Sequence, residues 1–249
     1  MRRRQASRRA SAWRSSRITA RCPGVDRLRR YREHSQGVAM VVHELRTPLM
    51  PVLTAAALLG SASPTQLLHM KGVIERKVEH LVRLVDDLMD VSRAESGKFH
   101  LRIKTLDLAK LLRSVHETCE PAITARGQRL ELRLPHGPVE LPGDAERLRQ
   151  VFANLVFNAC KYTPEGGRIA VEVEVFVESV VVSVSDGGIG IDAAMLPRVF
   201  DAFAQERRAT RYNGDGLGLG LAVVRELTEA HGGSVVAHSA GLGWEAGSR

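Results

Sequence analysis

The feature that most limits the fold of this chain is a run of apolar residues spaced for one face of a helix. The run starts at Val38 and repeats at alternating steps of four and three residues as far as Leu59. Its members are Val38, Val42, Leu45, Leu49, Val52, Ala56 and Leu59. This period is typical of a helix that packs in a bundle or coiled coil. We therefore predict a helix over residues 36–59.

His43 lies off this apolar face, so its ring is expected to point toward solvent or a partner. An exposed imidazole is a nucleophile, and Glu44 beside it can hydrogen-bond one ring nitrogen and leave the other basic. Pro48 and Pro51 interrupt the helical hydrogen bonds and predict a bend. Periodicity alone favours a plain interpretation, namely a single surface histidine on a kinked helix.

The charge of the chain is concentrated at its beginning. Residues 1–30 hold eleven arginines and one aspartate, a net charge of +10 out of a total of +8, so the remainder sums to −2. Residues 1–33 are predicted to be disordered. The near-neutral remainder excludes a nucleic-acid surface. The three cysteines are scattered without a Cys-x-x-Cys pair, which argues against a disulfide framework and favours a reducing cytoplasm.

A second apolar period predicts a helical hairpin over residues 34–100. A turn over residues 60–64 offers Ser63 as a helix cap and Pro64 as the first helical residue. The helix that follows has an apolar face formed by Leu67, Met70, Ile74, Val78, Leu81, Val82, Val85, Leu88 and Met89. Such a hairpin cannot bury both faces alone, which predicts a homodimeric four-helix bundle. No run of apolar residues is long enough to predict a membrane span.

Residues 101–249 change to a mixed pattern that predicts a two-layer α/β sandwich. We expect helices over 106–119, 144–161, 193–200 and 219–231, strands over 129–134, 168–177, 179–185 and 234–238, and turns at 137–138 and 142–143. The continuous apolar character of 179–185 predicts a strand in the centre of its sheet.

Asn154, Asn158 and Lys161 recur at steps of four and three, so they share one face of the predicted helix over 144–161. Amide groups suit a hydrated Mg²⁺ ion, and a lysine suits the phosphates that such an ion accompanies. A polar outer face of a helix explains the same pattern equally well.

Two glycine-rich segments are candidates for contact with a ligand. In residues 186–190 the glycines allow a flat ligand to approach the backbone, and Asp186 can accept a hydrogen bond from an exocyclic amine. A tight turn is the usual explanation of such a segment. Residues 214–222 open a helix, whose free amides and dipole favour an anion. Between the two, Phe200 and Phe203 fit an aromatic motif and core packing of a helix equally well.

Taken in order, these segments resemble the motifs of the sensor histidine kinases. His-Glu-Leu-Arg-Thr-Pro-Leu over 43–49 resembles the phosphoacceptor box of that family. The asparagine box, first glycine box, phenylalanine motif and second glycine box follow at 149–164, 186–190, 200–203 and 214–222. The resemblance covers roughly residues 36–243. It implies an α+β protein, in which a dimerisation and phosphoacceptor hairpin precedes an ATP-binding domain of the Bergerat type.

The resemblance also implies roles for individual residues. His43 would be phosphorylated, Glu44 would orient its ring, and Glu44 with Thr47 resembles the phosphatase motif of the family. Asn158 would hold Mg²⁺ with support from Asn154, and Asp186 would read the adenine amino group. The other residues expected at the nucleotide are Lys161, Tyr162, Gly188, Gly190, Phe203, Gly216, Leu217, Gly218, Leu219 and Gly220. Arg207, Arg208 and Arg211 lie in an expected lid, and solvated charges are the alternative.

The expected function is that of a cytoplasmic, ATP-dependent protein histidine kinase without nucleic-acid partners. Its phosphohistidine would pass the phosphoryl group to an aspartate of a separate response regulator. One departure from the family is that the chain ends at Arg249, where a closing strand usually follows residue 243. That missing end leaves a catalytically impaired, nucleotide-binding dimeric scaffold as one alternative. A second alternative is another ATPase of the same fold that does not phosphorylate itself, although the histidine box argues against it.

Overall fold

The computed structural model describes residues 41–42, 45–61, 63–95, 100–205 and 217–241, all within one structural unit. Residues 45–58 are helical, as the apolar period predicts, and a short 3₁₀ turn, η1 (Leu59–Ser61), ends that helix. Helix α2 (Pro64–Glu95) follows. The Ser63 amide donates to Gln66 Oε1 at 2.8 Å, and the Gln66 amide donates to Ser63 Oγ at 3.4 Å, so the predicted cap is confirmed as a reciprocal capping box.

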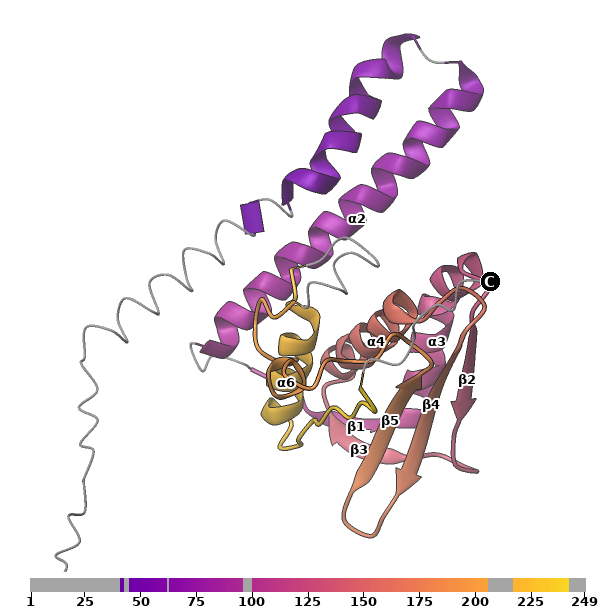
Figure 1. Ribbon diagram of the computed structural model, residues 1–249. Coiled ribbons are helices and arrows are strands. Elements are labelled where there is room, and N and C mark those ends of the chain that lie inside the picture. The colour runs from indigo at the N-terminus through magenta and orange to yellow at the C-terminus, as the bar shows by residue number, and fades with distance from the viewer. Residues whose placement is uncertain (1–40, 43–44, 62, 96–99, 206–216, 242–249) are drawn as a thin grey trace, which may run out of the picture. The chain divides into compact units, whose positions relative to one another are not determined.

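The two helices form the predicted antiparallel hairpin. Met50 and Thr54 of the first helix line one shallow pocket with His69 and Val73 of α2. Figure 1 shows the two helices side by side. Ala55 and Leu84 are buried in this single chain, but much of the apolar surface is not. The side chains left exposed on the hairpin include Val42, Leu49, Met50, Leu53, Val78, Val82, Val85 and Met89.

The rest of the described chain is the expected two-layer α/β sandwich, built around a sheet with the order β2-β4-β5. The strands are β2 (Arg129–Arg133), β4 (Arg168–Val175) and β5 (Val180–Asp186), with β2 parallel and β5 antiparallel to β4. The helices are α3 (Leu108–Ala125), α4 (Ala145–Tyr162) and α6 (Gly220–Ala230). A separate pair, β1 (Lys104–Asp107) with β3 (Glu140–Gly143), is antiparallel.

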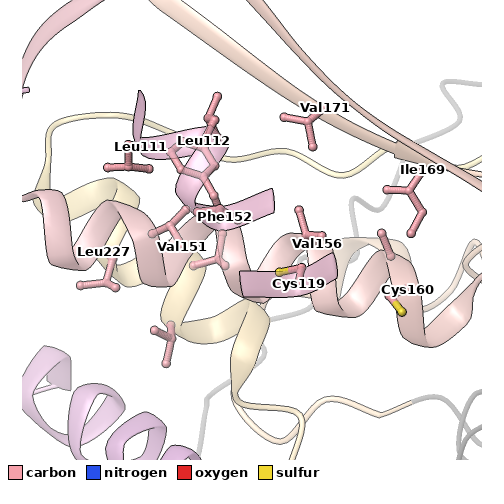
Figure 2. Close-up of a cluster of buried hydrophobic side chains, with 14 of the residues drawn as sticks. Leu111, Leu112, Cys119, Val151, Phe152, Val156, Cys160, Ile169, Val171 and Leu227 are labelled. Atoms are coloured by element: carbon pink, nitrogen blue, oxygen red, sulfur yellow. The ribbon is translucent and has the colours of Figure 1, made fainter. Parts of the chain in front are cut away.

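The core lies between the helices and the sheet. Figure 2 shows Leu112 and Cys119 of α3 and Val156 of α4 beside Ile169 and Val171 of β4. All five side chains are buried. Helix α4 packs against both α3 and α6, so it is the central helix of its layer. Its polar face is therefore held in a fixed place by neighbours on either side.

Five details of the predicted architecture are wrong. The helix expected over 106–119 is α3, which begins at Leu108, after β1, and continues to Ala125. Strand β5 is at the edge of the described three-stranded sheet and β4 is central, because only alternate valines of β5 pack on the core. Residues 193–200 form no α-helix; only a 3₁₀ turn, η2 (Leu196–Arg198), is present there. Residues 234–238 form no strand in the described chain. Residues 142–143 belong to β3 and not to a turn.

The start of α4 depends on Asp144, which was predicted as its cap. Asp144 Oδ1 accepts from the amides of Glu146 at 3.1 Å and Arg147 at 3.3 Å, and Oδ2 accepts from the Arg102 amide at 2.9 Å. Burial acts to raise the pKa of Asp144, but the hydrogen bonds from Arg102, Arg147 and Glu146 outweigh it and hold the pKa below its usual value. The carboxylate is thus kept charged at the helix N-terminus.

We predict that Asp144→Ala lowers the free energy of unfolding by about 1–2 kcal/mol at pH 7, measured by urea denaturation. Because the folded pKa is lowered, this stabilisation is complete above the ordinary carboxyl pKa of about 4 and is lost as the pH falls through the folded value. The difference between the two proteins should therefore shrink in acid. Glu146→Gln is the matched control, because it leaves both capping hydrogen bonds in place. An equal loss in that control would contradict the capping role.

Candidate nucleotide-binding site

Helix α4 carries the predicted asparagines on the side that faces the start of α6. Asn154 Nδ2 donates to the Gly220 carbonyl oxygen at 3.3 Å. A Cβ atom at position 220 would lie 3.7 Å from that nitrogen and 4.0 Å from Asn158 Nδ2. Both asparagines are half-buried. The end of the second glycine box therefore lies against the asparagine helix, as the sequence led us to expect.

The first glycine box lies at the carboxyl end of the same helix, directly after β5. The Gly188 amide donates to Asp186 Oδ1 at 2.8 Å, which closes a tight turn. The Ile189 amide donates to the Tyr162 carbonyl oxygen at 3.2 Å, and so ties this turn to the end of α4. A Cβ atom at Gly188 would lie 2.8 Å from the same carbonyl oxygen. Only glycine fits at that position without displacing the backbone.

Asp186 is the acidic group of this turn, and its side chain keeps an exposed side. Partial burial raises the pKa of the Asp186 carboxyl, and the hydrogen bond donated by the Gly188 amide opposes that rise. Its Oδ1 atom is engaged within the turn. A carboxylate held in this way retains acceptor capacity for a donor that approaches from solvent.

The segment that packs on the first glycine box comes from residues 239–241, which sequence reasoning did not assign to the site. The Ser239 hydroxyl accepts from the Ile191 amide at 2.9 Å and from the Gly241 amide at 3.2 Å. Gly190 has a φ of +74°, and a Cβ atom there would meet the Gly241 carbonyl oxygen. No local pattern near residue 239 signals this contact, because its partners lie almost fifty residues earlier in the chain.

The phenylalanine motif packs against the second glycine box. Gly218 has a φ of +68°, and a Cβ atom there would lie 2.6 Å from the Ala204 carbonyl oxygen. Phe203 has a φ of +63°, which is rare for a residue other than glycine. Phe200 and Phe203 both pack on the core, although neither is in a helix. The structure thus combines the two alternatives: the aromatic rings support the core, and the backbone touches the glycine segment.

Several more of the predicted residues lie within the described chain. Leu217 and Leu219 are buried and anchor the second glycine box in the core. Lys161 Nζ lies 5.3 Å from the centre of the Tyr162 ring, within the range of a cation–π contact. Thr47 is half-buried in the first helix of the hairpin. His43, Glu44, Gly216, Arg207, Arg208 and Arg211 lie outside the described residues.

The chemistry of the site suits a nucleotide. Amide side chains face the amino end of α6, whose free backbone amides favour an anion. Within the described ranges, no group of three or more His, Cys, Asp or Glu side chains could hold a metal ion. Asn158 is half-buried, and its side-chain oxygen is a suitable ligand for Mg²⁺ when water and phosphate oxygens complete the coordination shell. None of the described helices is both long and apolar enough to span a membrane.

A layer of helices on a mixed sheet, with two glycine turns beside an asparagine helix, defines a nucleotide-binding α/β domain that follows a helical hairpin. Comparison with protein families agrees. Residues 143–248 match the histidine kinase-, DNA gyrase B- and HSP90-like ATPases, and residues 33–97 match the His Kinase A (phospho-acceptor) domain. The chain belongs to the sensor histidine kinases of two-component systems.

Individual relatives support this assignment. The autoinducer 2 sensor kinase/phosphatase LuxQ of Vibrio parahaemolyticus is 34% identical over 209 residues, which are 81% of this chain and 24% of LuxQ. Among solved structures, the Acinetobacter baumannii histidine kinase AdeS is 25% identical, covers 80% of this chain and 92% of its own, and has a TM-score of 0.61. Full-length ShkA in complex with AMPPNP is 30% identical over 82% of this chain and 44% of its own, with a TM-score of 0.56. The chain thus spans about a quarter of the length of LuxQ.

We predict that Gly190→Ala lowers the free energy of unfolding by at least about 1 kcal/mol, because an L side chain is strained at positive φ and here also meets Gly241. Gly187→Ala in the same turn is the matched control. A Cβ atom there would meet only the Arg168 carbonyl oxygen, at an ordinary 3.8 Å. Denaturant unfolding of both variants measures the difference. Equal stability of the two variants would show that the contact with residues 239–241 is not formed in solution.

Proposed function

We propose that this chain is the catalytic core of a protein histidine kinase, which transfers the γ-phosphoryl group of ATP to His43. One observation carries the proposal. A phosphoacceptor hairpin precedes, in the same chain, a domain whose asparagine helix, first glycine turn and second glycine segment meet at one site. Family membership supplies the reaction class, and the geometry supplies a place for the nucleotide.

In this proposal, Asp186 accepts a hydrogen bond from the adenine amino group, while Gly188 and Gly190 allow the base to approach the backbone. Lys161 and Tyr162 flank the nucleotide at the end of α4. The phosphates lie near the second glycine box, which comprises Gly216, Leu217, Gly218, Leu219 and Gly220. Phe203 supports that segment because its backbone lies against Gly218. The complex of ShkA with AMPPNP supports nucleotide binding by this domain type.

Mg²⁺, held by Asn158 with Asn154 in support, would neutralise charge on the phosphates. A basic nitrogen of His43 attacks the γ-phosphorus. A nitrogen–phosphorus bond forms as the bond between that phosphorus and the bridging oxygen breaks, and ADP leaves with the electron pair. Glu44 orients the ring through its other nitrogen and accepts the proton that the attack displaces. The phosphoryl group then passes to an aspartate carboxylate on a separate response regulator.

We further propose that the working unit is a homodimer in the cytoplasm, where its substrate ATP is available. The apolar residues that one hairpin leaves exposed match what a four-helix bundle would bury. Because the relative LuxQ is named as both kinase and phosphatase, we propose that Thr47, with Glu44, positions a water molecule for the reverse reaction. The boundaries we propose are 34–100 for the hairpin and 101–249 for the ATP-binding domain.

Incubation with γ-labelled ATP tests the kinase reaction directly. We predict that the wild-type protein gains a label that is stable in alkali and lost in acid, as expected of a phosphoramidate. His43→Gln should abolish the label, whereas His69→Gln, on the exposed face of α2, should retain it. Asn158→Ala should lower the labelling rate by about a hundredfold, because it removes the side chain proposed to hold the Mg²⁺ that neutralises the phosphates.

Two outcomes would overturn the kinase proposal. Label that survives acid, or that persists in His43→Gln, would assign the chemistry to another residue. Binding of ATP without any phosphohistidine would indicate a scaffold, and release of phosphate without label would indicate an ATPase that does not phosphorylate itself.

Dimerisation has its own test. We predict that replacing Val82 and Val85 by Asp weakens the dimer by at least about a hundredfold, because each buried valine contributes about 1.5–3 kcal/mol. Analytical ultracentrifugation measures the monomer–dimer equilibrium. Arg83→Glu, at an exposed polar position between the two valines, is the control and should leave the dimer intact. A dimer that survives the double substitution would place the interface elsewhere.

A further inference from the structure

A buried carboxylate joins the hairpin to the ATP-binding domain. Asp90, near the end of α2, is 2% exposed. Its Oδ2 atom accepts from Arg147 Nη1 at 2.8 Å and from Gln150 Nε2 at 2.7 Å, and both donors belong to α4. The half-exposed Arg93 side chain places its Nη1 atom 3.6 Å from Asp90 Oδ1. A charge buried this deeply is stable only while its partners remain, so Asp90 ties the two helices together.

A second carboxylate, Asp87, lies one turn earlier on the same face of α2. Its burial raises its pKa to about 6; the negative charge of Asp90 adds to this rise, and hydrogen bonds from Gln150 and Asn154 oppose it. Asp87 and Asp90 therefore engage Arg147, Gln150 and Asn154. These three residues are spaced by three and four positions, so they share one face of α4.

The contact made by these five side chains is polar, and it lies on a helix, α2, that also packs against α6 and contributes Leu84 and Val91 to the core. The same amide of Asn154 that contacts Asp87 also donates to Gly220 at the end of the second glycine box. Asn154 is therefore shared between the α2 contact and the nucleotide site. Because Asn154 takes part in both, a change in the α2 contact alters the free energy of nucleotide binding, and nucleotide binding alters the stability of the α2 contact.

The proposed kinase reaction requires this contact to be reversible. The ring of His43 must first reach the γ-phosphate of ATP and later reach the aspartate of a response regulator. The ATP-binding domain and the regulator cannot both lie against the same ring nitrogen at once. A single fixed arrangement of the hairpin and the ATP-binding domain cannot serve both steps. Some contact between the two must therefore open during the cycle.

We infer that Asp87 and Asp90 form a carboxylate latch that holds the ATP-binding domain against α2 in the resting kinase and opens for phosphoryl transfer. This inference rests on the proposed function. The latch engages Asn154 and so restrains a residue of the nucleotide site in the resting arrangement. Asp87 and Asp90 are thus positioning residues, which act through α4 and not on the reacting atoms.

The test compares conservative substitutions in the intact dimer. Asp90→Asn keeps the shape of the side chain but removes the charge that Arg147 pairs with. We expect the initial rate of autophosphorylation to rise about threefold or more, and the radius of gyration in small-angle X-ray scattering to increase, as the closed population falls. Arg147→Gln should do the same. The double variant should exceed neither single variant, because both break one contact.

Gln150→Glu provides a second route to the open state, because the new carboxylate repels Asp90 and competes for Arg147. Asp86→Asn and Arg149→Gln are matched controls. Asp86 is the exposed neighbour of Asp87, and Arg149 on α4 hydrogen-bonds Ser114 instead of the latch. Both controls should match the wild type in rate and in scattering.

An unchanged or lower rate in Asp90→Asn, additive effects in the double variant, or an unchanged radius of gyration would each overturn the latch. Scattering does not depend on catalysis. If the wild-type protein forms no phosphohistidine, the kinase proposal fails, while the scattering of the Asp90, Arg147 and Gln150 variants still decides whether the contact holds the domain.

Discussion

The site depends on how the carboxyl end of α4 is held. A helix ends with carbonyl groups that have no partner within the helix. Here the buried Gln128 side chain donates to the Cys160 carbonyl at 3.0 Å and to the Thr163 carbonyl at 2.7 Å. The Tyr162 carbonyl accepts from Ile189 of the first glycine turn. The hydrogen bond from the Ile189 amide to the Tyr162 carbonyl therefore serves two purposes: it satisfies the helix end and fixes where the first glycine turn lies.

Backbone atoms, more than side chains, shape the rest of the site. Gly188, Gly190 and Gly218 each lie where a side chain would meet a carbonyl oxygen, and two of the three have positive φ. Because these main-chain segments approach closely, the backbone amide groups of the glycine segments lie beside the asparagine helix with little side-chain bulk between them. The hairpin works differently, through apolar side chains that a single chain leaves exposed and through the carboxylates that reach α4.

Local features were readable from the sequence because their causes are local. The caps at Ser63 and Asp144 are confirmed, and α2 and α4 begin and end close to where period and capping predict, whereas α3 continues six residues past its predicted end. The family resemblance, carried by contiguous motifs, led to the class of protein. The candidate site was predicted residue by residue. The structure places Gly220 beside Asn154 and Asn158, and it ties the first glycine box to Tyr162 at the end of the same helix. Their roles in binding remain proposals.

The hairpin, most of the helices and strands, and the polar and glycine residues of the site could be predicted from the sequence, since each depends on neighbours within a few positions. Four features could be seen only in the folded chain: the central position of β4, the pairing of β1 with β3, the contact of residues 239–241 with the first glycine turn, and the pairing of Asp90 with Arg147. Apart from the pairing of β4 with β5, the contacts behind these features join residues more than thirty positions apart. A valine run or a lone aspartate looks the same in the sequence whether or not such a partner exists, because pairing over that distance is set by the packing of the whole core.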